Sequence, residues 1–348
     1  MTRSQHLQFF ITRNNITLSS AFCLKSTIGS LNQIPNIVIY GGVHGTETAG
    51  VDAIIKFVQM VENKEVNLKN CNIIFILGNP AAYLADKRFI DENLNRCFVD
   101  QDIVFPEVFS VGSNMGTRVT TSQNYERNRA EEISQYLSSL QSLNYSLDFH
   151  SVSSGDLKVA ICQGDTKQID FMVNVCDLKT QFVYDKDSLI GTTMELGVNL
   201  GALCCAIECG NHKDKNAFKV GLQSIIKLLE NIDCIDKNTD ITNMHSEENI
   251  YDTTATIRYT SISKIVPEIG FCWSLPVVET GVFVPKGTIY ARIGSEDDKN
   301  SFAQYDKKDT IKKNVNKVAN RDMYLFIPDK NPNPNDSDAG FFCEREFV

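Results

Sequence analysis

The sequence contains no apolar run that approaches the ~20 residues of a membrane-spanning helix. Its first residues lead into no long apolar stretch either, so we expect no signal peptide and no membrane partner. Acidic side chains outnumber basic ones by 43 to 34, and the formal net charge is -9. Because nucleic-acid-binding proteins present basic surfaces, this balance argues against a nucleic acid partner and leaves a small-molecule partner open.

The sequence also lacks any Cys-x-x-Cys pair, although it contains 11 cysteines. The count is odd, and several cysteines lie in or beside apolar runs that resemble buried strands. These are Cys71, Cys162, Cys204, Cys205 and Cys209. We expect them to be reduced core residues, which is the usual state of thiols in a reducing compartment. The composition therefore predicts a cytoplasmic protein.

Short β-branched runs alternate with segments of helical spacing through the first two thirds of the chain, which indicates an α/β fold with a sheet between helices. The expected strands are residues 37–40, 72–78, 145–149, 158–162 and 203–209. The expected helices are residues 47–61, 125–140 and 214–229. At the start of the chain, apolar residues in 7–12 and 15–23 predict a hairpin.

Two further segments stand out by composition. Residues 79–123 show little regular pattern, and a loop of that length in a compact domain is usually functional. Residues 231–249 turn polar, which predicts a domain boundary. We therefore expect a catalytic α/β domain over residues 1–238 and a β-rich domain over residues 239–348, where short apolar runs are broken by proline and glycine.

His44 and Glu47 come soon after the expected strand at residues 37–40. Strand ends at glycine-rich turns are where open α/β sheets bind ligands. His150 ends another apolar run, so two strand ends can bring three donors to one edge of the sheet. Two imidazoles and one carboxylate form a ligand set of catalytic zinc sites, which keep a further position open. Asp148 is a candidate hydrogen-bond partner for His150.

Two other groups suit hydrolytic chemistry. Glu208 ends an apolar run, and burial there would raise the pKa of its carboxyl group, which suits a general base. The long loop carries Arg88 and, eight residues later, Arg96 with Asn95 beside it. One guanidinium can grip a substrate carboxylate, and the other can stabilise an oxyanion. The alternatives are a solvated glutamate at a strand end and a solvated basic loop.

Taken together and in this order, the motifs resemble the succinylglutamate desuccinylase/aspartoacylase family, which is related to the zinc carboxypeptidases. The resemblance implies a carboxypeptidase-like mixed sheet flanked by helices, followed by a smaller β-rich domain. Its matching segments extend from residue 42 to residue 210, about half of the chain. They are residues 42–47, 79–80, 88–91, 94–96, 125–130, 148–151 and 207–210.

The resemblance also implies roles for individual residues. His44, Glu47 and His150 match the family's zinc ligands, which implies one Zn2+ per chain. Glu208 matches the catalytic glutamate, and Arg88 matches the arginine that polarises the scissile carbonyl.

Asn95 and Arg96 match the pair that holds the substrate carboxylate.

Two departures from the family pattern concern the residues that would contact the rest of the substrate. Aspartoacylases carry a further arginine before the catalytic glutamate, but residues 191–201 contain none. Their substrate-facing tyrosine corresponds here to phenylalanines at residues 341–342, with Tyr324 as an alternative. The missing arginine argues against N-acetylaspartate as the substrate.

The sequence therefore predicts a zinc-dependent hydrolase that cleaves the amide bond of a small N-acyl amino acid or a related acylated amine. Two alternatives stay open. One is a metallocarboxypeptidase that acts on peptides, and the other is a non-catalytic zinc-binding or ligand-binding relative. Whether the chain forms a homo-oligomer is also open.

Overall fold

The structure, a computed structural model, divides the chain into two compact units. Unit 1 comprises Met1–Lys179 and Leu189–Asp252, and unit 2 comprises Thr180–Ser188 and Thr253–Val348. The predicted division after residue 238 falls within residues 237–255, outside the described part, and stays a prediction. The described residues are 1–26, 34–98, 124–153, 155–175, 178–184, 190–236, 256–265, 271–275, 282–293, 315–319, 321, 323–326 and 340–347.

Unit 1 is built on a mixed sheet with the strand order β1-β3-β2-β4-β7-β5. The inner strands β3, β2, β4 and β7 are parallel, whereas β1 and β5 pair antiparallel at either side. This confirms the expected α/β fold with a mixed sheet. The strands are β1 (Ala21–Ser26), β2 (Asn36–Gly41), β3 (Cys71–Leu77), β4 (Tyr145–Val152), β5 (Lys158–Gln163) and β7 (Leu203–Asn211).

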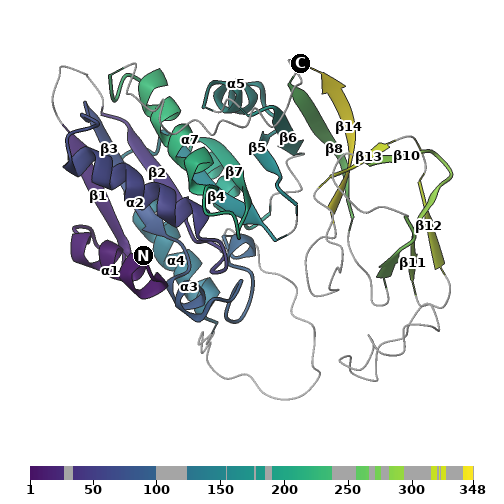
Figure 1. The fold of residues 1–348 in the computed structure, drawn as a ribbon, viewed down its shortest axis with the longest axis horizontal. Coiled ribbons are helices and arrows are strands. Elements are labelled where there is room, and N and C mark those ends of the chain that lie inside the picture. Colours follow the sequence, from purple (N-terminus) through teal and green to yellow (C-terminus); the bar gives the residue numbers. More distant parts are fainter. Residues whose placement is uncertain are drawn as a thin grey trace, which may run out of the picture. The chain divides into compact units, whose positions relative to one another are not determined.

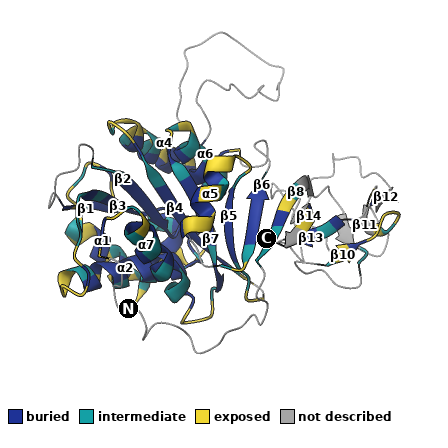
Figure 2. Cartoon of the chain, turned by 90° about the horizontal axis from the view of Figure 1, so that it is seen from above, coloured by how far each residue is buried: buried dark blue, intermediate teal, exposed yellow. Residues whose placement is uncertain are grey.

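Helices cover both faces of this sheet. Figure 2 shows α2 and α7 on one side, and α4 and α6 on the other. The helices are α1 (Arg3–Arg13), α2 (Ala49–Glu62), α3 (Pro80–Ala85), α4 (Tyr125–Ser138), α5 (Thr166–Val175), α6 (Thr193–Asn199) and α7 (Phe218–Asn231), and a 3-10 turn, η1, covers Leu94–Arg96. The expected strands and the helix at 125–140 are confirmed, whereas α3, α5, α6 and η1 were not predicted.

The predicted N-terminal hairpin is wrong. Residues 3–13 form α1, because Thr2 and Gln5 make a capping box and the buried His6, Phe9 and Phe10 recur at helical spacing. The strand that follows, β1, pairs with β3 rather than with a segment next to it in the sequence, and Ala21 lies opposite Ile76. An apolar run of this length is compatible with either a strand or a helix, and the capping box of Thr2 and Gln5 favours the helix.

The core of unit 1 lies between the sheet and its helices. The strands β2, β3 and β4 are buried almost throughout, as their near-continuous apolar runs predict for parallel strands. α2 and α7 pack against each other over one face (Figure 1). Gly50 of α2 allows the start of this helix to lie close to β4, because a Cβ there would lie 2.5 Å from Phe149 Cβ. The start of α2 is thereby fixed against the end of β4.

All described regular elements of unit 2 are strands, which confirms the expected β-rich C-terminal part. They form one sheet in the order β6-β8-β14-β13-β10 and a smaller one in the order β12-β11-β9. Their bounds are β6 (Thr180–Tyr184), β8 (Ile257–Ile265), β9 (Phe271–Trp273), β10 (Phe283–Val284), β11 (Ile289–Ile293), β12 (Val315–Val318), β13 (Met323–Phe326) and β14 (Gly340–Phe347).

Two further sequence expectations concern the membrane and the thiols. Within the described ranges, no helix is both long enough and apolar enough to cross a bilayer. The free cysteines that the structure describes are all buried, as expected; they are Cys23, Cys71, Cys97, Cys162, Cys204, Cys205, Cys209, Cys234 and Cys343.

Candidate metal centre

The three predicted ligands converge at one end of the parallel strands in unit 1. His44 and Glu47 lie in the loop between β2 and α2, and His150 lies near the end of β4. Because β2 and β4 are parallel neighbours, their carboxyl ends meet at the same edge of the sheet. The expected helix at residues 47–61 begins only at Ala49, so Glu47 stands in the loop before it.

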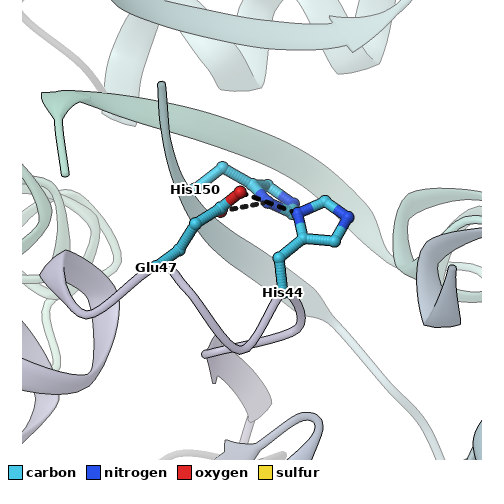
Figure 3. Close-up of side chains that lie close together, drawn as sticks. All are labelled: His44, Glu47 and His150. Atoms are coloured by element: carbon cyan, nitrogen blue, oxygen red, sulfur yellow. Dashed lines mark hydrogen bonds and ion pairs between the residues drawn. The ribbon is translucent and has the colours of Figure 1, made fainter. Parts of the chain in front are cut away.

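The carboxylate of Glu47 faces both imidazoles (Figure 3). Its Oε1 is 2.9 Å from Nδ1 of His44, and its Oε2 is 3.0 Å from Nδ1 of His150. All three side chains are buried, and each offers a ligand atom that lies within 4.8 Å of the other two. This group can hold a metal ion, and its donor set of two imidazoles and one carboxylate is that of catalytic zinc sites.

The remaining ring nitrogens are held by partners outside the ligand group. Nε2 of His150 donates to Oδ2 of Asp148 at 2.9 Å, as the sequence predicts. Nε2 of His44 donates to Oδ1 of Asn93 at 3.0 Å. Partners of this kind fix ring orientation and tautomer in metal sites. Both Nδ1 atoms are thereby turned toward Glu47, which is the arrangement that a shared cation requires.

The pKa shifts of these three side chains are also compatible with binding of a cation. Burial disfavours the charged form of Glu47, but attraction to His44 and hydrogen bonds with both imidazoles outweigh it and hold the pKa of Glu47 well below its ordinary value. Burial and the nearby Arg88 lower the pKa of His44 to about 4. For His150, the carboxylate of Asp148 overcomes burial and raises the pKa well above its ordinary value.

A neutral His44 carries a single ring proton, and the acceptor Asn93 Oδ1 draws that proton to Nε2. The assignment of Oδ1 as acceptor is supported by a second donor, the backbone N–H of Asn95 at 2.9 Å. In this neutral form Nδ1 keeps its lone pair and faces Glu47 without a hydrogen bond, whereas the protonated ring donates from Nδ1 to Oε1 of Glu47. A positive ion between these two atoms would stabilise this arrangement, so the residues present fit a divalent metal.

Glu208 is the third acidic group of the site. It stands directly opposite His150 in the pairing of β7 with β4, and paired residues of neighbouring strands point to the same face. Its Oε2 is shielded from solvent and has no hydrogen-bond partner among the described residues. Burial raises the pKa of Glu208 to about 7. A half-buried carboxylate with an unpartnered oxygen is a candidate functional group.

The predicted arginine reaches the same group from another loop. Nη1 of Arg88 is 3.2 Å from Oε1 of Glu47, and about half of the Arg88 side chain is exposed (49%). The Arg88 side chain therefore contacts the buried Glu47 and is also accessible to solvent. Charged donors so arranged can stabilise negative charge that develops on a substrate.

Asn95 and Arg96 lie on η1, two and three residues after Asn93, the partner of His44. Oδ1 of Asn95 accepts from the backbone N–H of Thr193, at the start of α6, at 2.9 Å. Nη1 of Arg96 donates to the carbonyl of Asn95 at 2.6 Å. Thr193 Oγ1 also donates to Oδ2 of Asp148. A chain of hydrogen bonds therefore leads from Asn95 to the partner of His150.

Sequence reasoning assigned no role to Asn93 or Thr193. Asn93 had a local signal, since it caps η1 by accepting from the N–H of Asn95. Thr193 had none, because its contact with Asp148 joins residues 45 positions apart.

Gly45 brings the ligand loop and the arginine-bearing loop into contact. Its N–H donates to the carbonyl of Arg88 at 3.0 Å, and its carbonyl accepts from Arg3 of α1 at 2.5 Å. A Cβ at Gly45 would lie closer than 3.0 Å to backbone atoms of Ala82 and Lys87, which cannot swing away as a side chain can. No residue with a side chain fits at this position without moving the loop.

We expect Gly45→Ala to lower the free energy of unfolding by about 1–3 kcal/mol, the usual cost of overpacking. It should also weaken metal binding, because the same displacement moves His44. Denaturant unfolding of the metal-free protein measures the first effect, and metal titration measures the second. Wild-type values in both would contradict the close packing described above.

We expect Asp148→Asn to weaken metal binding by about 10–100-fold, the range found when the partner of a metal-bound histidine is changed. The amide is nearly isosteric but loses the charge that holds the Nε2 proton of His150. Competition with a chelator measures the dissociation constant. Asp170→Asn, an exposed position on α5, is the matched control and should bind metal like the wild type. Equal affinity in both variants would exclude this role for Asp148.

A sequence model of the succinylglutamate desuccinylase/aspartoacylase catalytic domain matches residues 33–232. Among curated proteins, a probable aspartoacylase from Nostoc sp. is 30% identical over 148 residues, which cover 42% of this chain and 44% of that protein. The rat N-acyl-aromatic-L-amino acid amidohydrolase (carboxylate-forming) is 28% identical over 151 residues, 42% of each chain. The chain thus aligns with less than half the length of these relatives.

Solved structures support the fold. The succinylglutamate desuccinylase from Vibrio parahaemolyticus aligns with a TM-score of 0.60 over 94% of this chain and 86% of that chain, at 16% identity. Murine aminoacylase 3 aligns with a TM-score of 0.54 over 92% of this chain and 98% of that one, at 14% identity.

The sequence model covers more than half of the 348 residues and includes every candidate site residue. The resemblance noted in the sequence is thereby confirmed. The chain belongs to the succinylglutamate desuccinylase/aspartoacylase family.

Proposed function

We propose that this chain is a zinc-dependent hydrolase that cleaves the amide bond of a small N-acyl amino acid or a related acylated amine. The observation that carries the proposal is the convergence of His44, Glu47 and His150 in a buried group near Glu208, whose Oε2 has no hydrogen-bond partner among the described residues. In this proposal the three residues hold one Zn2+ per chain. An ion held there would supply a Lewis acid for the acyl oxygen and would lower the pKa of a bound water.

Residues of the chain supply the remaining steps of the proposed reaction. Glu208 takes a proton from the attacking water and returns it to the leaving amine, for which a pKa near 7 is suitable. Arg88, whose guanidinium lies 3.2 Å from Glu47, stabilises negative charge on the acyl oxygen. Asn95 and Arg96 hold the substrate carboxylate and so fix the scissile bond.

The names of the relatives support deacylase chemistry of this kind. They describe an aspartoacylase, a succinylglutamate desuccinylase and an amidohydrolase of N-acyl-aromatic amino acids. These names share an acylated amino acid and differ in both its halves, so the proposal is made at the level of the substrate class. The buried free thiols and the net charge of -9 support the further proposals of a cytoplasmic location and no nucleic acid partner.

The test is an activity screen of the zinc-loaded protein. The substrates are N-acylated amino acids in which the acyl group and the amine are varied independently, with peptides as a second set. We expect hydrolysis of acylated amino acids that a chelator abolishes and added zinc restores. Preferential cleavage of peptides would instead identify a metallocarboxypeptidase. Absence of hydrolysis across both sets would leave only a binding function.

A further inference from the structure

A buried carboxylate on α4 holds the segment that carries Arg88, Asn95 and Arg96. We call residues 88–96 the arginine loop. Glu126, the second residue of α4, is 0% exposed. It is separated from the arginine loop by 30 or more positions in the sequence, and no individual role was predicted for it beyond its place in the family motif.

Both oxygens of Glu126 accept hydrogen bonds from the arginine loop. Oε1 accepts from the backbone N–H of Ile90 at 2.6 Å and from Nδ2 of Asn79 at 2.9 Å. Oε2 accepts from the backbone N–H of Asp91 at 2.9 Å and of Glu92 at 3.3 Å. Three consecutive backbone N–H groups thus surround one carboxylate, which is the geometry of an anion-binding nest.

This arrangement accounts for a buried charge without an ion pair. Within the described residues Glu126 makes no salt bridge, and a buried carboxylate is costly unless hydrogen bonds satisfy it. Four donors do so here. Hydrogen bonds to an ionised acceptor are about twice as strong as those between neutral groups. The charge of Glu126 therefore orders the loop backbone around it.

The first turn of α4 and the arginine loop are also joined in the opposite direction. The backbone N–H of Tyr125 donates to Oδ2 of Asp91 at 2.8 Å, and Nη2 of Arg127 donates to Oε2 of Glu92 at 2.9 Å. Three successive residues of α4 thus contact the loop. These two contacts are exposed to solvent, so the buried hydrogen bonds of Glu126 hold the loop more strongly than they do.

The anchored residues 90–92 lie between the two parts of the loop that reach the metal centre. On one side Arg88 reaches Glu47 at 3.2 Å, and on the other Asn93 holds the ring of His44 at 3.0 Å. Asn95 and Arg96 follow directly. A shift of the anchored residues would move all of these groups together, and a misplacement of 1 Å can reduce turnover about 100-fold.

We propose that Glu126 is a positioning residue, which holds the arginine loop so that Arg88 faces the acyl oxygen and Asn95 and Arg96 face the substrate carboxylate. The inference rests on the proposed function for its catalytic consequence. Its structural consequence, an ordered loop backbone, does not depend on the substrate.

The test is Glu126→Gln in the full-length, zinc-loaded protein. The amide removes the charge and turns an NH2 group toward backbone donors. We expect the amides of Ile90, Asp91 and Glu92 to exchange hydrogen at least about tenfold faster. We also expect kcat/KM to fall about 100-fold, with kcat lowered and KM raised, because the loop serves both the acyl oxygen and the carboxylate. Metal content should stay at one ion per chain.

Two variants separate this role from a general loss of stability. Glu131→Gln makes the same change at an exposed position of α4, and should match the wild type in exchange and kinetics. Glu126→Asp keeps the charge on a shorter side chain, and we expect it to fold and to show smaller effects of the same kind. A purely structural role would lower the melting temperature of the Asp variant without raising KM.

Two results would overturn the inference. One is unchanged exchange of the three loop amides in both Glu126 variants, which would mean that the carboxylate does not order the loop. The other is faster exchange with wild-type kcat and KM, which would mean that loop order does not position the reacting groups. If the wild-type protein hydrolyses no acylated amine, the proposed function fails, whereas the exchange measurement still reports whether Glu126 orders the loop.

Discussion

Glu208→Gln should abolish turnover while the protein keeps its metal. Gln has nearly the same shape but can neither take up a proton nor return one, so both proposed proton transfers are lost. General acid–base catalysis contributes about 100–10,000-fold, and we expect kcat to fall by at least the upper part of this range. The three ligands are untouched, so metal content should remain at one ion per chain. Steady-state kinetics and elemental analysis of the same preparation measure both.

The control for this prediction is Glu131→Gln, the same exchange at an exposed position, which should leave kcat unchanged. The free energy of unfolding should not fall in Glu208→Gln, because Oε2 of Glu208 has no described partner to lose. Turnover of the Gln variant within about tenfold of the wild type would remove Glu208 from the mechanism and require another base.

Glu47→Gln should have the opposite metal phenotype. Glu47 is the only one of the three ligands with a negative charge, and it lies within 3.0 Å of both Nδ1 atoms. Its amide loses that charge and one of the two acceptor oxygens. Loss of a partner outside the ligand group already costs about 10–100-fold in affinity, so loss of the charged ligand should cost at least about 100-fold. Activity should fall with metal content.

Glu208→Gln is the matched control for Glu47→Gln, because both variants replace a carboxylate of the same site by an amide. Competition of each variant with a chelator gives the dissociation constants, and excess zinc should partly restore activity to Glu47→Gln only. Wild-type affinity in Glu47→Gln would refute the assignment of this residue as a ligand. Equal loss of metal in both variants would instead place Glu208 among the ligands.

The strand ends were predictable because their signals are local. A short β-branched run followed by glycine located β2, and a short apolar run that ends at His150 located β4; His44 and His150 follow from these strand ends. Parallel pairing of neighbouring strands then required their carboxyl ends to meet. Asp148 was predictable in the same way, since it lies two residues before His150 on the same face of β4.

The errors and omissions have a common origin in packing. The first residues form α1 rather than a hairpin, since β1 pairs with the distant β3. The contact of Asn95 with Thr193 was not predicted, because it joins residues 98 positions apart and has no local signal. The role of Glu126 depends likewise on partners more than 30 positions away.

By itself, the sequence identified His44, Glu47 and His150 as candidates for one shared site, because residue type and the pattern of the flanking apolar runs are local features. Only the tertiary structure decided how these side chains are oriented: which ring nitrogens of His44 and His150 face Glu47, which oxygen of Glu208 stays unpartnered, and which carboxylate orders the arginine loop. The physical reason is that orientation is set by hydrogen bonds between residues far apart in the chain, and these form only when the sheet and its helices bring them together.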